Sequence, residues 1–274
     1  MIQITAQTRG PNFRDVSLKT LRFPGGEMHV TVGDAGAEPV ISLGIRAHLP
    51  DSDAVMALLM TTDALRRAYP GVPLTLDLPY VPYARQDRVA NPGESHSAKV
   101  FCGLINAQYY AAVTVQDPHS DVVTALLDRV IVADPVPALR RAIAQIGEPV
   151  ALVAPDGGAR KRVLKLAKEL GGLQVVFADK NRDPRDGKIT GTEVQGGLPD
   201  CALLVVDDIC DGGRTFTELA MAIKQKQETE HFARPLYLYV THGIFSKGLE
   251  PLLAGYDRVF TRNNWTADDR AVTV

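Results

Sequence analysis

The sequence predicts an α/β protein of two domains, each with a mainly parallel β-sheet flanked by helices. Its 274 residues are about twice the usual length of a single domain. Apolar segments of strand length alternate with helical patterns along the whole chain, which is typical of parallel α/β layers. Each half contains enough of these segments for a sheet of its own.

The first half begins with short strands and continues as alternating helices and strands. A helix is predicted from Ser52 by apolar residues at helical spacing, and the Pro70-Gly71 turn signal ends it. In the next predicted helix, Val100, Phe101, Leu104 and Ile105 fall on one face. The other predicted elements are strands at 28–32, 40–43, 72–78 and 111–115, and a polar loop at 83–97.

The Asp134-Pro-Val-Pro137 segment is the best candidate for a boundary, and it predicts domains at 1–136 and 137–274. The second half repeats the scheme, and its polar stretch at 179–200 is predicted to be a long loop or a hairpin. The last strand is a candidate to pack back on the first domain. The predicted helices lie at 138–146, 159–170 and 217–226, and the strands at 149–154, 173–178, 203–206, 235–241 and 256–261.

Composition limits the classes of partner. Hydrophobic residues make up 45% of the chain and charged residues 23%, and the net charge is −2. This near-balance argues against a nucleic-acid partner, and no apolar run approaches the length of a membrane span. The N-terminal residues lack the pattern of a signal peptide, and the three cysteines have no CxxC spacing. We therefore expect a cytoplasmic protein with reduced thiols.

The segment Leu203–Thr215 is the main functional candidate. An apolar strand leads into Asp207 and Asp208, then into Asp211 and a Gly-Gly pair, with a helix after it. A glycine turn at a helix N-terminus favours an anion such as phosphate, and carboxylates suit sugar hydroxyls or a divalent ion. The alternative is an ordinary turn capped by Asp. Three carboxylates in one segment favour a ribose-phosphate site.

Polar residues also follow other predicted strands, at the edge where α/β sheets bind ligands. Asp117 or Asp156 alone would most often cap a turn, but four such clusters together suit a divalent ion, a phosphorylated sugar and phosphoryl transfer. The clusters are 116–119, 155–158, 179–182 and 207–211.

The loop Pro82–Arg88 is a further candidate, because its arginines could bind triphosphate oxygens and Gln86 could orient a base or ribose. Its alternative is a solvated surface loop. The chain has neither a Walker-type GxxxxGK[ST] motif nor GxGxxG.

Seven segments in order resemble the ribose-phosphate pyrophosphokinase (phosphoribosyl pyrophosphate synthetase) family over almost the whole chain. They are Phe23-Pro-Gly-Gly-Glu27, Pro82-Tyr-Ala-Arg-Gln-Asp-Arg88 with Ser97-Ala-Lys-Val-Phe101, Asp117-Pro-His-Ser120, Ala154-Pro-Asp-Gly-Gly158, Asp179-Lys-Asn-Arg182, Val206-Asp-Asp-Ile-Cys-Asp-Gly-Gly-Arg-Thr215 and Thr241-His-Gly-Ile-Phe-Ser246.

The resemblance implies two phosphoribosyltransferase-like domains and transfer of the β,γ-diphosphate of ATP to the 1-hydroxyl of ribose 5-phosphate, with Mg²⁺ as cofactor. It implies a homo-oligomer, because the first segment reaches a neighbouring subunit's site in the family. Lys180 and Arg182 would be catalytic, on a mobile loop over the transferring group, and His119 and Asp156 would bind Mg²⁺. The implied ATP-binding residues are Phe23, Gly25, Gly26, Glu27, Arg85, Gln86 and Asp87. The implied ribose-phosphate-binding residues are Arg182, Asp207, Asp208, Asp211, Gly212, Gly213, Arg214 and Thr215.

The chain departs from the family at two places. Gly25 stands where a carboxylate would read the adenine amine, which leaves strict ATP preference open. Gly212 replaces a Thr, and Arg214 replaces a Gly in the phosphate loop. Arg214 either adds a contact to the 5-phosphate or to a larger acceptor such as ADP-ribose, or it points outward from the helix start. A non-catalytic regulatory subunit is the third hypothesis, disfavoured because His119 and the other implied catalytic residues are present.

Overall fold

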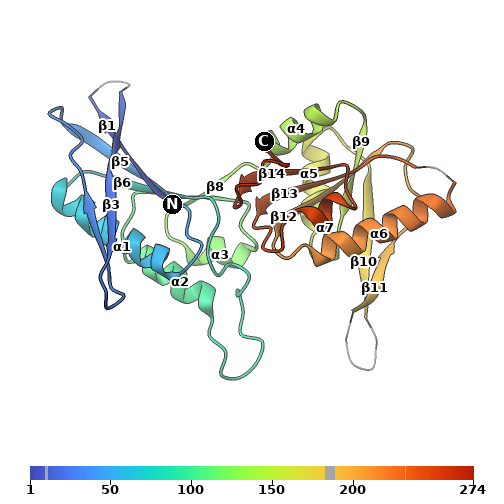
Figure 1. Ribbon diagram of the computed structural model, residues 1–274, viewed down its shortest axis with the longest axis horizontal. Helices are drawn as coiled ribbons and strands as arrows, with labels where there is room; N and C mark the ends of the chain where they lie inside the picture. The colour runs from blue at the N-terminus through green and yellow to red at the C-terminus, as the bar shows by residue number, and fades with distance from the viewer. Residues whose placement is uncertain (10–11, 183–188, 232) are drawn as a thin grey trace. The chain divides into compact units, whose positions relative to one another are not determined.

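The computed structural model describes Met1 to Val274 except residues 10–11, 183–188 and 232, and the side chains of residues 180–182 and 189–190 are also outside the described part. The chain divides into two compact units, Met1–Ala133 and Asp134–Val274 (Figure 1). The division lies close to the predicted boundary after residue 136, and independent folding of each unit stays a prediction. Within the described residues, none of the helices is both long enough and apolar enough for a membrane span.

The first unit contains a six-stranded sheet in the order β2-β1-β5-β6-β7-β8. Strands β5 to β8 are parallel, while β1 is antiparallel to both of its neighbours. The strands are β1 (Ile2–Thr8), β2 (Phe13–Val16), β5 (Val40–Ala47), β6 (Leu74–Leu78), β7 (Val113–Gln116) and β8 (Val130–Ala133), and a separate antiparallel ribbon pairs β3 (Leu18–Arg22) with β4 (Met28–Val32). The helices of this unit are α1 (Ser52–Ala68), α2 (Ser97–Asn106) and α3 (Asp121–Leu126).

Helix α1 begins at Ser52, as predicted, because Asp51 caps it. The Asp51 carboxylate accepts a hydrogen bond from the Ala54 N–H at 2.8 Å, which satisfies one of the unpaired donors of the first turn. Leu58 and Leu65, two turns apart, are fully buried in the core of the first unit. The helix ends before Pro70, which cannot continue it.

The buried face of α2 differs from the predicted one. Phe101 and Ile105 enter the core, but the side chains of Val100 and Leu104 are exposed, with whole-residue exposures of 60% and 42%. The prediction was wrong for these two because Ala98 and Cys102 share the buried stripe instead, at i−3 and i+1 from Phe101.

The second unit contains a seven-stranded sheet in the order β11-β10-β9-β12-β13-β14-β15. All strands are parallel to their neighbours except β11, which forms an antiparallel hairpin with β10. The strands are β9 (Val150–Ala154), β10 (Val175–Arg182), β11 (Ile189–Val194), β12 (Ala202–Cys210), β13 (Leu236–Gly243), β14 (Arg258–Asn264) and β15 (Ala271–Thr273). The helices are α4 (Val136–Ile146), α5 (Arg160–Glu169), α6 (Arg214–Thr229) and α7 (Glu250–Leu253).

The central strand β12 is covered on both faces, which explains its unbroken apolar run. Leu203 and Val205 pack in one cluster with α6 residues such as Leu219. Leu204 and Val206 pack in a second cluster with residues of α4 and α5, such as Val163. Because successive strand residues point to opposite faces, the two clusters lie on the two sides of the sheet. The predicted α/β fold is confirmed.

Three details of the second unit differ from or sharpen the predictions. Strand β12 continues to Cys210, so Asp207 and Asp208 lie within the strand instead of after it. The stretch at 179–200 is a hairpin, in which Lys180 lies opposite Thr192. The predicted last strand, at 256–261, corresponds to β14, which pairs with β13 and β15 in the sheet of the second unit. The sequence analysis did not predict β1–β3, β8, β15, α3 or α7.

Gly243 ends β13 at a position that has no room for a side chain. A Cβ atom added there would overlap the ring of Phe245, a buried residue with a φ of 48°. We expect Gly243→Ala to lower the free energy of unfolding by about 1–3 kcal/mol, because the ring must move. The measurement is the urea midpoint.

Gly103 provides the control for this substitution. It lies on an exposed part of α2, and nothing lies within 4 Å of an added Cβ. Gly103→Ala should therefore stabilise the protein, by up to about 1 kcal/mol, because Ala is the better helix former. Equal urea midpoints for the two variants would contradict the steric role of Gly243.

Candidate functional site

The acidic end of β12 is held by an arginine from a neighbouring helix. The Arg162 guanidinium, on α5, donates to the Asp207 carboxylate and lies 3.4 Å from an oxygen of Asp208. The side chains of Asp207, Asp208 and Arg162 are only 16%, 10% and 23% exposed. One cation therefore bridges two adjacent carboxylates in a mostly buried setting.

The environment changes the acidity of Asp207. Burial raises the pKa of this carboxyl, the Arg162 charge partly offsets the rise, and the Asp208 charge adds to it. The Asp208 N–H also donates to Asp207 Oδ1 at 2.9 Å. Carboxylates placed in this way can accept hydrogen bonds from sugar hydroxyls.

The glycine turn after β12 is fixed by the end of β13. The N–H groups of Ile244 and Phe245 donate to the carbonyl of Cys210 at 2.9 and 3.1 Å. The Ser246 N–H donates to the Asp211 carbonyl at 3.2 Å, and the Ser246 hydroxyl donates to the Asp211 carboxylate at 2.7 Å. The turn that leads into α6 is thus built against a second loop.

Gly213 and Arg214 begin α6. Gly213 has a φ of 76°, a left-handed conformation that favours glycine, and Leu252 lies 3.3 Å from an added Cβ. Arg214 is 80% exposed, and its Nε donates to Glu218 Oε1 at 2.6 Å, one turn along the helix. The structure thus shows the outward arrangement of Arg214, and the binding roles of Asp211 to Thr215 stay predictions.

Asp156 organises the turn between β9 and α5. Its Oδ1 accepts hydrogen bonds from the N–H groups of Gly158 and Ala159 at 3.0 and 3.2 Å. This is the turn-capping role that the sequence offered as the alternative to Mg²⁺ binding. The metal role stays a prediction.

The base of the β10–β11 hairpin is tied to α5. Arg160 donates to the Asp179 carboxylate at 2.5 Å, and its guanidinium carbon lies 5.2 Å from the centre of the Phe177 ring. Gln195, beyond β11, donates to the same carboxylate oxygen. The backbone of Lys180 and Arg182 continues this hairpin, but their side chains lie outside the described part.

In the first unit, two predicted clusters come together. Asp87 is mostly buried, which raises the pKa of its carboxyl, but the Ser120 hydroxyl, Arg88 and the His119 charge outweigh burial and hold this pKa below its ordinary value. The Arg88 Nε donates to Asp87 at 3.2 Å, whereas the Ser120 hydroxyl lies near the carboxylate without normal hydrogen-bond geometry. The 82–88 loop and the 117–120 loop are therefore neighbours.

Arg85 and Gln86 are exposed on this same loop. The Gln86 carbonyl accepts a hydrogen bond from the Ala98 N–H at 3.3 Å, which joins the loop to the start of α2. Asp117 has a φ of 40°, an uncommon value for a residue other than glycine. Strained backbone of this kind is frequent at functional sites.

The Phe23–Glu27 segment is the turn of the β3–β4 ribbon. The Phe23 N–H donates to the Glu27 carbonyl at 2.9 Å, and Gly26 takes a φ of 95°. All five residues are exposed, including Phe23 and Gly25. The structure places this turn at the tip of the ribbon, and its ATP contact stays a prediction.

The described residues contain no cluster of three or more His, Cys, Asp or Glu side chains suited to a metal ion.

Sequence reasoning missed several residues that organise the second unit. Arg162, Arg160 and Ser246 each contact an aspartate of a predicted cluster. The basic run at 160–162, at the start of a predicted helix, was the available signal for the two arginines. The residue that each arginine contacts depends on strand order, which the sequence does not state.

Three comparisons relate the chain to known proteins. A sequence profile of the N-terminal domain of ribose phosphate pyrophosphokinase matches residues 11–108. A ribose-phosphate pyrophosphokinase of Campylobacter jejuni is 31% identical over 246 residues, which cover 85% of this chain and 74% of the relative. The one from Hyphomonas neptunium is 34% identical over 202 residues, 72% of this chain and 62% of the relative.

A solved structure shares the fold. The phosphoribosylpyrophosphate synthetase from Mycobacterium smegmatis aligns with a TM-score of 0.74 at 23% sequence identity, over 90% of this chain and 80% of that one. At this identity the likeness supports the architecture, and it agrees with the predicted α/β class.

Arg162 can be tested through stability. Because the pKa of Asp207 is above its ordinary value, the folded protein holds a proton that the unfolded chain releases. The Asp207 carboxyl group therefore contributes most to stability below about pH 4, and its contribution falls as the pH rises towards its pKa in the folded protein. Arg162→Met removes the offsetting charge, so it should lower the free energy of unfolding by about 2–4 kcal/mol at about pH 8 and by less at about pH 5. Urea titrations at both pH values measure the difference.

Lys161→Met is the matched control, because Lys161 is the exposed neighbour of Arg162 on α5. It should change the free energy of unfolding by less than about 0.5 kcal/mol at either pH. If Arg162→Met lowers the free energy of unfolding by the same amount at both pH values, the electrostatic role of Arg162 is contradicted.

Proposed function

This chain belongs to the ribose-phosphate pyrophosphokinase family, a family of diphosphotransferases, and we propose that its first unit binds ATP and its second unit binds ribose 5-phosphate. The 1-hydroxyl of the sugar attacks the β-phosphorus of ATP, AMP leaves, and phosphoribosyl pyrophosphate forms. The observation that carries the proposal is the end of β12, where the Arg162-bound Asp207–Asp208 pair precedes the glycine turn of α6.

The acceptor sugar suits this part of the second unit. Asp207 and Asp208 offer oxygens that accept hydrogen bonds from ribose hydroxyls. The N-terminus of the 16-residue helix α6 favours the charge of the 5-phosphate, because its N–H groups and dipole attract anions. The acidic pair and the α6 N-terminus follow each other directly in the chain. They are therefore suited to a sugar and a phosphate that are joined in one molecule.

The ATP contacts are assigned to the first unit. Arg85 and Gln86 are exposed on a loop whose backbone is joined to α2, so their side chains can reach a ligand from a fixed base. Arginine pairs with phosphate oxygens through a planar fork of donors. Asp87 is engaged with Arg88 and lies near His119, so its role is to position this loop.

Mg²⁺ is the proposed cofactor, with His119 and Asp156 as the protein groups that would contribute to holding it. When bound, this ion neutralises phosphate charge and polarises the group that is transferred. Asp156 already shapes the β9–α5 turn, so it would present a carboxylate from a fixed backbone.

Lys180 and Arg182 are proposed to offset the charge that develops on the attacking and departing oxygens. Phosphoryl transfer needs positioning and charge stabilisation more than covalent help. The Arg160–Asp179 pair supports this proposal, because it fixes the strand immediately before Lys180.

Ribose 5-phosphate is the proposed acceptor, and the structure offers no specific observation in favour of ADP-ribose. That alternative was motivated by Arg214, whose guanidinium pairs with Glu218.

We also propose a cytoplasmic homo-oligomer with a shared site, in which the exposed Phe23–Glu27 turn contacts a neighbouring subunit.

The direct test is incubation of the purified chain with ATP, Mg²⁺ and ribose 5-phosphate. We expect AMP and phosphoribosyl pyrophosphate in equal amounts, detected by chromatography and ³¹P NMR. Parallel reactions with ADP-ribose separate the two acceptors. No AMP release with either sugar at saturating Mg²⁺ would overturn the proposal and revive the regulatory-subunit hypothesis.

Lys180→Ala tests the catalytic assignment. We expect kcat to fall by about 10²–10³-fold or more while ATP binding stays nearly intact, because the charge is needed mainly in the transition state. Lys168→Ala, on the exposed end of α5, is the control and should leave kcat unchanged. Equal losses in kcat and in ATP affinity for Lys180→Ala would contradict this role.

A further inference from the structure

The glycine turn of the proposed acceptor site has a lysine, Lys247, beside it. The Cε, Cδ and Cγ atoms of Lys247 lie 3.6, 3.7 and 3.9 Å from the position of a Cβ atom added to Gly212. These are ordinary van der Waals distances. The lysine stem therefore lies beside the one residue of the turn that has lost its side chain relative to the family pattern, at the distance at which it would contact a side chain there.

The position of Lys247 is set by a rigid loop. Its neighbour Ser246 is bonded to Asp211 through both its N–H and its hydroxyl. On the other side, the Gly248 N–H donates to the Phe245 carbonyl at 2.8 Å, and Gly248 has a φ of 75°. The backbone is thus joined to the turn just before Lys247 and is closed by a hydrogen bond within its own loop just after it.

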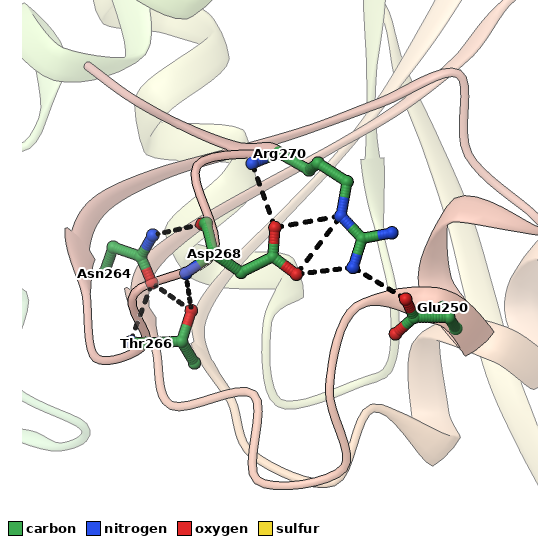
Figure 2. A network of polar contacts seen from close by, with 5 residues as sticks. All are labelled: Glu250, Asn264, Thr266, Asp268 and Arg270. Carbon is green, nitrogen blue, oxygen red and sulfur yellow. Dashed lines mark hydrogen bonds and ion pairs between the residues drawn. The ribbon is translucent and has the colours of Figure 1, made fainter.

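A polar network holds the far end of this loop, where α7 begins. Figure 2 shows that Arg270 connects Glu250, at the start of α7, with Asp268 on the β14–β15 connection, with Nη2 contacts of 2.7 and 2.5 Å. Asp268 is in turn joined to Thr266 and Asn264. The network joins the start of α7, three residues after Lys247, to the β14–β15 connection.

The charges around the turn leave a role for a cation. Asp207, Asp208 and Asp211 all precede the turn, and a phosphate dianion would add to their negative charge. Arg162 is bound to the first two carboxylates, and Arg214 is paired with Glu218. Burial raises the pKa of the Cys210 thiol to about 12, so this neighbour of the turn stays neutral.

We propose that Lys247 is a substrate-binding residue whose ammonium group pairs with the 5-phosphate of the acceptor sugar at the α6 N-terminus. This inference rests on the proposed function of the second unit. Lysine acts as a point charge, so it favours a phosphate monoester, with nearly two negative charges, over a phosphodiester-like group with one charge at that phosphorus. Lys247 thereby contributes to selecting ribose 5-phosphate over acceptors with a substituted 5-phosphate.

The test uses Lys247→Met, which keeps most of the apolar stem and removes the charge, and Lys247→Arg, which keeps a charge. For Lys247→Met we expect the KM for ribose 5-phosphate to rise about 10–100-fold, as for loss of a charge-assisted contact, with the KM for ATP unchanged. Lys247→Arg should retain most of the affinity. Lys165→Met, an exposed change on α5, is the matched control and should leave both KM values unchanged.

Two further measurements make the outcome decisive. The KM of the wild type for ribose 5-phosphate should rise with added salt, and this rise should be smaller in Lys247→Met. The urea midpoint of Lys247→Met should match that of the wild type, because the residue is exposed. An unchanged KM for ribose 5-phosphate, or an equal rise in both KM values, would overturn the inference. Absence of AMP release in the wild type would instead overturn the proposed function.

Discussion

The pairing of Arg162 with Asp207 and Asp208 is the interaction on which the second unit's site depends. Two consecutive carboxyl groups on a central strand lose hydration, and each disfavours the charge of the other, so a nearby cation stabilises them. Because Arg162 comes from α5, the same contact also fixes that helix against the end of β12. The β9–α5 turn, which Asp156 organises, is thereby held in a defined position relative to the acidic pair. One guanidinium joins two clusters that lie about fifty residues apart in the sequence.

A second constraint links β12 to β13. The Cys210 carbonyl accepts two N–H groups from the loop after β13, and Asp211 accepts both polar hydrogens of Ser246. This pairing continues the register of the parallel strands, in which Cys210 lies opposite Gly243. The glycine turn that is proposed to bind the 5-phosphate is therefore an extension of sheet structure, and its backbone is held by hydrogen bonds within the protein. Preorganised N–H groups bind an anion without a further ordering cost.

Local signals in the sequence were sufficient for much of the fold and for the location of the site. Asp51 and the apolar spacing behind it placed the start of α1, and the apolar run before Asp207 identified a strand covered on both faces. The strands β1 to β3 were missed because they are antiparallel strands rich in polar residues, and such segments resemble loops in a sequence. Arg162 could be seen only as part of a basic helix, since its two carboxylate partners are set by strand order. For Lys247 there was no signal at all, because its contact with Gly212 exists only after β12 and β13 have paired.

The acceptor site combines two modes of recognition that differ in rigidity. Asp207 and Asp208 are mostly buried and are held by Arg162, so they would recognise the sugar hydroxyls by fixed geometry and with little screening by salt. Lys247 is exposed and has a long flexible stem, so it would recognise the 5-phosphate by charge. A threonine at position 212 would instead offer a hydroxyl from the turn itself, in the space beside which the Lys247 stem lies. Gly212 and Lys247 are therefore neighbours, and the lysine offers a charge at the place where a threonine would offer a hydroxyl. On the proposed assignment, selection among 5-substituents would depend on an exposed charge, while selection for ribose would depend on a pair of mostly buried carboxyl groups held by Arg162.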